Sequence, residues 1–199
     1  YAGAQCLLMG ISLADYFIWD GVRAVDYLLT RPEIDTDRLG ITGRSGGGTQ
    51  TAMIAAYDDR ILAAAPECYI TSYGRLFQSI YMQDAEQNFY NGLKKNFDHA
   101  DYFYLRGTKP SLLITTTNDF FSIQGARETY SEVRSLYSKL GLNGNITMVE
   151  DVGVHESTIK NRESLYSFFQ KHLDLPGDAG EVIIKPLTAE ELRVTSTGQ

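Results

Sequence analysis

The chain reads Gly43-Arg44-Ser45-Gly46-Gly47 between a strand-like run at 39–42 and a helix-like run at 49–56. A serine on a tight strand-to-helix turn adopts a strained backbone conformation, and its hydroxyl then projects beyond the sheet. We expect the glycines on either side of it because a Cβ there would collide with the neighbouring strand or helix. The stretch therefore predicts an α/β fold with Ser45 as a candidate nucleophile. A glycine-rich loop that only turns the chain has the same five-residue pattern, so other parts of the sequence must decide.

The composition of the 199 residues is that of an ordinary globular protein, with 43% hydrophobic and 22% charged residues. The length allows one sizeable core. A formal net charge of −7, with scattered basic residues, argues against nucleic acid as a partner, because phosphate binding needs clustered Lys and Arg. No apolar run approaches the roughly 18 residues of a membrane span, so we expect no membrane partner.

The two cysteines, Cys6 and Cys68, fit no zinc or redox motif, and each has apolar neighbours. We therefore expect buried free thiols. No pair of His or Cys residues has the spacing of metal ligands, so we expect neither a metal nor another cofactor.

Strand-like and helix-like segments alternate along most of the chain, which predicts a mainly parallel sheet with right-handed crossovers. In such a sheet the active site lies beyond the carboxyl ends of the strands. The expected strands are 38–43, 61–66, 112–116 and 146–150, and the expected helices are 12–30, 46–57, 125–140 and 157–173. Ser12 and Asp15 form the expected cap of the first helix.

The segment 69–104 interrupts this alternation with helices and loops, and it carries 10 of the 23 aromatic residues. One interpretation is a small helical subdomain with an aromatic core; the other is a surface whose rings stack on sugars. The aromatic residues are Tyr69, Tyr73, Phe77, Tyr81, Phe89, Tyr90, Phe97, Tyr102, Phe103 and Tyr104. We expect one domain over 1–175 with this insertion, followed by an extension or linker at 176–199.

A serine hydroxyl needs a base to accept its proton, and His155 is the candidate. Of the three histidines, it alone follows a predicted strand through a short loop. His99 lies in the aromatic segment with no strand before it. His172 lies in the last turn of the final helix, where the helix dipole favours a histidine. We therefore expect structural roles for His99 and His172.

The base in turn needs an acid that fixes its tautomer, and Asp119 follows the third predicted strand. An N-cap for the next helix is the other interpretation of Asp119. Glu67, which follows the second strand, is the alternative acid. Because Ser45, Asp119 and His155 each follow a strand in this chain order, the sequence predicts the nucleophile, acid and base of an acyl transfer.

The oxyanion of such a reaction needs backbone donors, and the N–H of Gly46 is the first. The second should come from a loop after an earlier strand, but only 44 residues precede Ser45. We therefore expect the chain to be the C-terminal portion of a hydrolase domain. Its partner would be the remainder of the parent polypeptide, whose strands would cover the edge of the Ser45 strand.

Four stretches resemble the acetyl xylan esterase-like branch of the α/β-hydrolases, and the resemblance covers roughly residues 1–173. They are Gly43-Arg44-Ser45-Gly46-Gly47-Gly48-Thr49-Gln50-Thr51, Gln83-Asp84-Ala85-Glu86-Gln87-Asn88, Thr116-Thr117-Asn118-Asp119-Phe120-Phe121-Ser122-Ile123 and Val154-His155-Glu156. The resemblance implies a three-layer α/β-hydrolase sandwich, with Ser45 as nucleophile, His155 as base and Asp119 as acid. It also implies a secreted or periplasmic protein that acts on carbohydrate esters.

The resemblance does not choose between O-acetyl groups and methyl esters of uronic acids as the substrate. Arg44, Glu67 and Tyr69 are candidate substrate contacts. A prolyl oligopeptidase-like serine peptidase shares the turn and the residue order, but we find no clear motif that would anchor a peptide. A non-catalytic module with the same fold is the third alternative, since the second oxyanion donor is missing.

Overall fold

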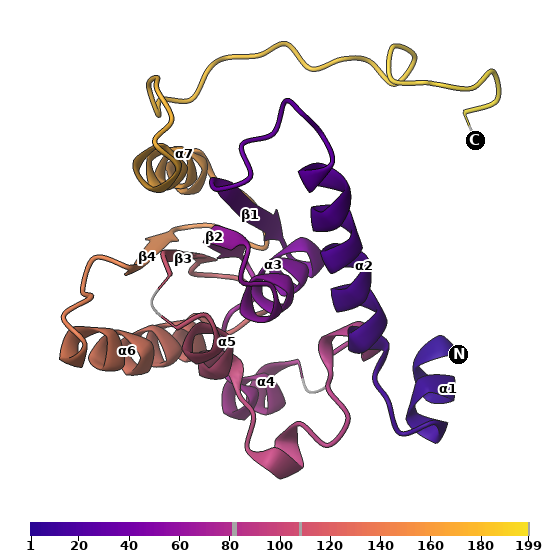
Figure 1. The fold of residues 1–199 in the computed structure, drawn as a ribbon, viewed down its shortest axis with the longest axis vertical. Helices are drawn as coiled ribbons and strands as arrows, with labels where there is room; N and C mark the ends of the chain where they lie inside the picture. The colour runs from indigo at the N-terminus through magenta and orange to yellow at the C-terminus, as the bar shows by residue number, and fades with distance from the viewer. Residues whose placement is uncertain (81–82, 108, 199) are drawn as a thin grey trace.

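Four parallel strands form the central sheet, in the order β1-β2-β3-β4 (Figure 1). The computed structural model of the chain describes residues 1–80, 83–107 and 109–198. The strands are β1 (Leu39–Arg44), β2 (Ile61–Glu67), β3 (Ser111–Thr116) and β4 (Ile146–Asp151). All three pairings are parallel, so every connection crosses from one end of the sheet to the other. The four carboxyl ends therefore lie along one edge.

The burial of each strand follows its apolar content. All six residues of β3 are buried, and β2 is buried except at Leu62. The middle of each of these two central strands is apolar, because helices cover both of their faces. The outer strands β1 and β4 are more polar and only partly buried. Within the described part of the chain, β1 pairs with β2 alone and is an outer strand.

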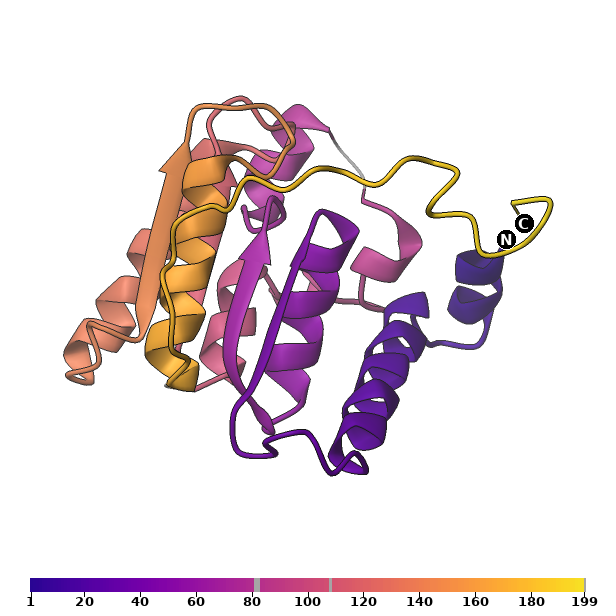
Figure 2. The same cartoon turned by 90° about the horizontal axis from the view of Figure 1, so that it is seen from above.

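Helices cover both faces of the sheet and complete three layers, as Figures 1 and 2 show. On one face lie α3 (Gly46–Tyr57) and α6 (Ile123–Lys139), with α5 (His99–Leu105) packed between them. The other face is covered by α7 (Ile159–Leu173). The long helix α2 (Leu13–Leu29) packs against α3 on the β1 side of the molecule. The predicted three-layer α/β sandwich is confirmed.

The start of α2 follows the expected capping box. The N–H of Ser12 donates to the Asp15 carboxylate at 2.8 Å, and the Ser12 side chain caps the N3 backbone. A short helix before it, α1 (Ala2–Leu8), was not expected from the sequence. Only Cys6 is buried in α1, so the helix shows no apolar stripe that a pattern could detect.

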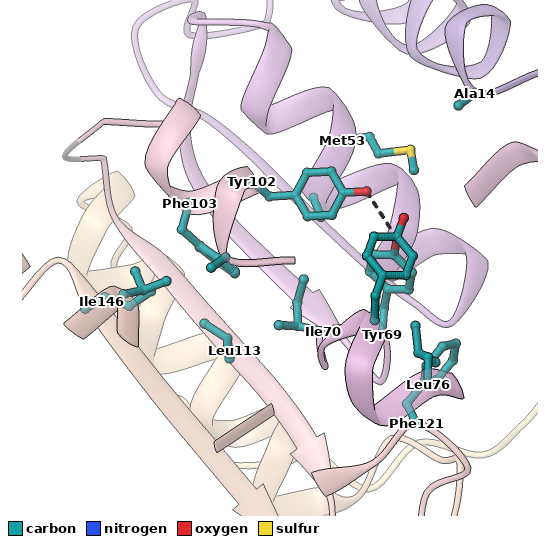
Figure 3. Packing of buried hydrophobic residues seen from close by; sticks show 14 of the residues in the cluster. Ala14, Met53, Tyr69, Ile70, Leu76, Tyr102, Phe103, Leu113, Phe121 and Ile146 are labelled. Atoms are coloured by element: carbon teal, nitrogen blue, oxygen red, sulfur yellow. Dashed lines mark hydrogen bonds between the residues drawn. The ribbon is translucent and has the colours of Figure 1, made fainter. Parts of the chain in front are cut away.

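The aromatic segment belongs to the main core of the molecule. It contains α4 (Tyr73–Ser79), two short 3₁₀ helices η1 (Ala85–Gln87) and η2 (Leu93–Lys95), and α5, with no strand among its described residues. Tyr69, Tyr102 and Phe103 pack in one cluster with residues of α3 and β3 (Figure 3). It is therefore not a separate subdomain with a core of its own. Tyr81 lies outside the described residues.

His99 is the polar centre of this aromatic cluster. The ring is fully buried, with ring centroids 4.9 Å from Tyr69 and 5.1 Å from Tyr73. Its Nδ1 accepts the N–H of Thr71 at 3.2 Å. Burial lowers the pKa of His99 to about 3, because the imidazolium would lose its hydration there. This is the structural role expected for His99.

The segment after α7 has neither helix nor strand up to residue 198 and extends away from the body (Figures 1 and 2). Near its beginning, the Arg162 guanidinium binds the Glu181 carboxylate at 3.0 Å. Among the described helices, none is long and apolar enough to cross a membrane by itself. Together α1 and α2 reach the required length and composition, but they are bent by 106°.

We predict that His99 makes the fold sensitive to acid. The pKa of His99 in the folded protein lies below its ordinary value of 6.5. Between these two values the unfolded chain binds a proton at His99 and the folded chain does not. Stability is therefore present above pH 6.5 and falls as the pH drops toward 3. Lowering the pH from 7 to 5 should lower the free energy of unfolding by about 2 kcal/mol through this residue. Denaturant unfolding of His99→Gln should show a correspondingly weaker pH dependence. An unchanged dependence in this variant would contradict the assignment.

Candidate active site

The turn after β1 holds Ser45 in the strained conformation that the sequence predicts. Ser45 has φ 59° and ψ −119° and is the N-cap of α3. A positive φ is uncommon for a residue with a side chain, so the surrounding structure must impose it. The Ser45 N–H donates to the carbonyl of Glu67 at 3.0 Å, which ties the turn to the end of β2.

Two glycines make this turn possible, and only one of them is in the expected place. A Cβ on Gly43 would lie 2.6 Å from the backbone of Gly47, and a Cβ on Gly48 would overlap the carbonyl oxygen of Glu67. A Cβ on Gly47 would meet nothing within 4 Å. The expectation that both glycines of the five-residue pattern are required is therefore right for Gly43 and wrong for Gly47. The second constraint acts on Gly48, where α3 touches β2.

Gly46 is the first residue of α3, so its N–H has no acceptor within the helix. A Cβ built on Gly46 would meet nothing within 4 Å, which shows open space on that side of the turn. Its predicted role as an oxyanion donor is compatible with this position. We identify no second donor in the described part of the chain.

The structure brings Asp119 and His155 into direct contact beyond β3 and β4. Nδ1 of His155 lies 2.9 Å and 3.0 Å from the two carboxylate oxygens of Asp119. The Asp119 side chain is only 3% exposed and also accepts the N–H of Phe121 at 3.0 Å. It does not cap α6, because Ser122 is the N-cap of that helix. Of its two interpretations, the structure therefore fits the partner of a histidine.

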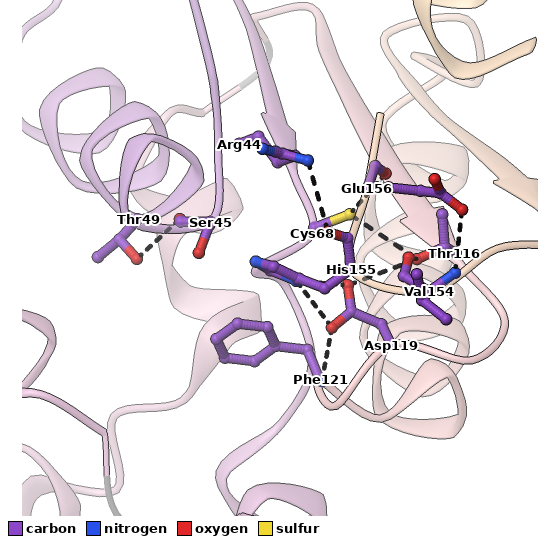
Figure 4. A network of polar contacts seen from close by, with 10 residues as sticks. All are labelled: Arg44, Ser45, Thr49, Cys68, Thr116, Asp119, Phe121, Val154, His155 and Glu156. Atoms are coloured by element: carbon purple, nitrogen blue, oxygen red, sulfur yellow. Dashed lines mark hydrogen bonds and ion pairs between the residues drawn. The ribbon is translucent and has the colours of Figure 1, made fainter. Parts of the chain in front are cut away.

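This contact determines which nitrogen of His155 could accept a proton. A carboxylate facing Nδ1 keeps the proton there, so Nε2 has a free lone pair. Nε2 is buried and has no hydrogen-bond partner among the described residues. In Figure 4 the ring extends from Asp119 toward Ser45, but no hydrogen bond joins it to the serine. Such contacts often tighten only when substrate binds.

Two aromatic rings that were not expected at this site from the sequence flank the histidine. The rings of Phe120 and His155 have centroids 4.2 Å apart, and Phe121 lies 5.9 Å away. Both phenylalanines directly follow the candidate acid in the sequence. Two aromatic residues after an acid at a strand end are the signal that could have placed them here.

Glu67 lies at the end of β2, opposite Arg44 in the register. It is buried, and burial raises the pKa of its carboxyl group. Because Nδ1 of His155 is bonded to Asp119, the structure does not bring the alternative acid to that nitrogen. Glu67 Oε1 has no hydrogen-bond partner among the described residues.

The other two candidate substrate contacts differ in exposure. Arg44 is exposed beside Ser45, and its guanidinium donates to the carbonyl of His155 at 3.4 Å. Tyr69 is fully buried, with its hydroxyl 3.3 Å from that of Tyr102. The expectation that Tyr69 contacts substrate is corrected here, since a ring without exposed surface cannot stack on a sugar.

One cluster contains three residue types that bind metals. The ligand atoms of Cys68, Asp119 and His155 all lie within 4.8 Å of one another. Burial raises the pKa of the Cys68 thiol to about 12, so it stays neutral, whereas a metal requires the thiolate. Nδ1 of His155 is already engaged by Asp119. The cluster therefore fits an acid–base pair beside a neutral thiol better than a metal site.

A cavity of about 690 Å³ lies elsewhere, between α2, α3 and the aromatic segment. Met53, Tyr57 and Tyr90 are among its lining residues, whereas Ser45, Asp119 and His155 are not. The candidate chemistry is therefore at the carboxyl edge of the sheet and not in this cavity.

Comparison with known proteins identifies the class. The prolyl oligopeptidase family matches residues 13–175, and the chain belongs to this family. It is therefore a member of the α/β-hydrolase superfamily, as the sequence motifs indicated. A protein of Bacillus subtilis (strain 168), YtaP, provisionally named a hydrolase, is 26% identical over 171 residues. The match covers 85% of this chain and 57% of YtaP.

Solved structures of similar fold include carbohydrate esterases. A carbohydrate esterase family 15 (CE15) glucuronoyl esterase from Caldicellulosiruptor kristjansonii has a TM-score of 0.66 at 18% identity, over 88% of this chain and 55% of that one. The methylesterase BT1017 has a TM-score of 0.62 at 24% identity, over 85% of this chain and 38% of that one. At these identities the likeness shows the fold. The chain spans about half the length of the relatives it matches.

We predict that Gly48→Ala destabilises the protein and that Gly47→Ala does not. The new methyl group at position 48 would overlap the Glu67 carbonyl, so α3 must shift away from β2, at a cost of about 1–3 kcal/mol. The methyl group at position 47 enters open space in the same helix turn and is the matched control. Equilibrium denaturation measures both. Equal stability of the two variants would refute the proposed contact.

Proposed function

We propose that the protein is a serine carboxylic-ester hydrolase that acts on esterified carbohydrate. The contact between Asp119 and His155, with Nε2 free and directed toward Ser45, carries this proposal. The strained turn that presents the serine supports it. Paired acid and base groups at the carboxyl ends of parallel strands are what nucleophilic catalysis by a serine requires.

In the proposed mechanism Nε2 of His155 accepts the proton of Ser45 while Oγ attacks the ester carbonyl. The Gly46 N–H and the start of α3 stabilise the negative charge on the carbonyl oxygen. The imidazolium is held by Asp119 and passes its proton to the leaving alkoxide. Water then repeats the sequence on the acyl-enzyme and releases the acid.

For the substrate we propose O-acetyl groups on xylan, which are one of the two classes of carbohydrate ester that the sequence resemblance implies. Esters of uronic acids are the second candidate. This candidate is supported by the similar folds of a glucuronoyl esterase and a methylesterase. The exposed, positively charged guanidinium of Arg44 beside Ser45 also supports it. Membership of the prolyl oligopeptidase family supports a third candidate, a serine peptidase.

We also propose that a segment outside these 199 residues pairs with the free edge of β1 and supplies the second oxyanion donor. Two observations support this. The strand that delivers Ser45 has a neighbour on one side only in the described structure. Large apolar side chains of α2, among them Phe17 and Trp19, are exposed, and the helix itself lies on the β1 side of the molecule (Figure 1). For this reason the assays below use the complete polypeptide.

We predict that Ser45→Ala removes ester hydrolysis with little loss of stability. A fluorophosphonate probe should label the wild-type enzyme and not this variant, because the probe needs an activated serine.

Asp119→Asn should lower kcat by up to about 10⁴, since an amide no longer fixes the histidine tautomer. If Glu67→Gln is more damaging than Asp119→Asn, the acid is Glu67. If the fluorophosphonate probe does not label the wild-type protein, the result favours the non-catalytic module.

We predict that acetylated xylan is hydrolysed faster than two other substrates offered in parallel, namely methyl-esterified pectin and a proline-containing peptide. The readouts are released acetate, methanol and amine, with Ser45→Ala as the blank for each. If pectin is hydrolysed fastest, the proposed substrate is a uronate ester and not an acetyl ester. Cleavage of the peptide alone would make the protein a peptidase.

A further inference from the structure

The loop that carries His155 is held through its main chain by side chains from three strand ends (Figure 4). The carbonyl of Val154 accepts the hydroxyl of Thr116, at the end of β3, at 2.6 Å. The carbonyl of His155 accepts Nη1 of Arg44, at the end of β1, at 3.4 Å. The carbonyl of Glu156 accepts the thiol of Cys68, just past β2, at 3.5 Å. Three consecutive carbonyls are therefore tied to three neighbouring strands.

Side-chain packing does little to hold the same loop. Val152 and Val154 expose 78% and 59% of their surface, so they fix no position by burial. The backbone N–H of Asn118 adds one more bond, to the carbonyl of Gly153 at 2.9 Å. Hydrogen bonds to the main chain therefore restrain the loop, while the imidazole itself is held by its bond to Asp119 and its contact with the Phe120 ring.

Arg44 differs from the other two donors because it precedes Ser45 directly in the chain. Its bond to the carbonyl of His155 joins the residue next to the nucleophile to the residue that is the base. Glu67 lies opposite Arg44 in the register, and the charge of Arg44 acts to lower the Glu67 pKa, which burial raises. Nε2 of His155 has no hydrogen-bond partner among the residues that the structure describes, so no such bond fixes its distance from the serine.

We propose that Arg44 is a positioning residue that sets the separation between Ser45 Oγ and His155 Nε2, and that Thr116 restrains the same loop from β3. The inference rests on the proposed serine mechanism. Misplacement of a catalytic group by about 1 Å costs on the order of 10²-fold in rate. Loss of either restraint therefore lowers kcat for every ester, irrespective of its alcohol or its charge.

The test measures kcat and KM of the complete polypeptide on 4-nitrophenyl acetate, a small neutral ester. Arg44→Met keeps the length of the side chain and removes its donors, and kcat should fall about tenfold to hundredfold with KM nearly unchanged. The rate of fluorophosphonate labelling should fall by the same factor. Arg44→Lys, which retains one donor, should restore part of the loss. Arg127→Met, at an exposed arginine that pairs with Glu150, is the matched control and should behave as the wild type.

A second pair of variants tests the restraint from β3. Thr116→Val removes the hydroxyl at nearly constant volume, with its 2.6 Å bond to the Val154 carbonyl and its 3.5 Å contact with the Asp119 carboxylate, and should lower kcat, whereas Thr116→Ser should restore it. Thermal unfolding separates this effect from loss of the fold. If Arg44→Met raises KM for carbohydrate esters only and leaves 4-nitrophenyl acetate hydrolysis intact, Arg44 is a substrate contact and the positioning role is overturned. If Ser45 is labelled at the wild-type rate in both Arg44→Met and Thr116→Val, the inference fails while the serine mechanism stands.

Discussion

The carbonyl of Glu67 is the contact on which the candidate site depends. It accepts the N–H of Ser45 at 3.0 Å, and it lies so close to Gly48 that no side chain fits between them. These two contacts bring the first turn of α3 against the end of β2 and hold Ser45 at a positive φ. A backbone strained by 1–3 kcal/mol persists only where its surroundings over-determine it. Here one main-chain oxygen supplies much of that constraint.

The rest of the site follows from parallel pairing. Because all strands run in one direction, residues that are distant in the sequence meet wherever strands end. Asp119 and Glu67 show how neighbouring positions on this edge acquire different properties. Asp119 is paired with His155 and with the N–H of Phe121, whereas Glu67 has one oxygen without a partner in the described part of the chain and a pKa raised by burial. One carboxyl group at the end of β2 and one just past β3 thus differ in their hydrogen-bond partners.

Much of this arrangement could be predicted from the sequence, because strand ends and short loops leave local signals. The positions of Ser45, Asp119 and His155 at the edge needed only apolar runs and chain order. The contacts of Thr116 and Cys68 with the histidine loop left no such signal, since they join side chains to carbonyls far along the chain. The burial of Tyr69 has a local cause that the sequence pattern does not show. Cys68 has φ 50°, which turns the chain inward after β2 and directs the next residue into the core.

The candidate nucleophile Ser45 follows β1, one of the two outer strands of the described sheet. Any strand that pairs with the free edge of β1 would bond to the backbone within a few residues of Ser45, and it would stiffen the turn while it completes the sheet. Assembly of the sheet and preparation of the serine would then be a single event. Such an enzyme would be inert while incompletely folded, and its reactivity toward a serine-directed probe would report how far folding had proceeded.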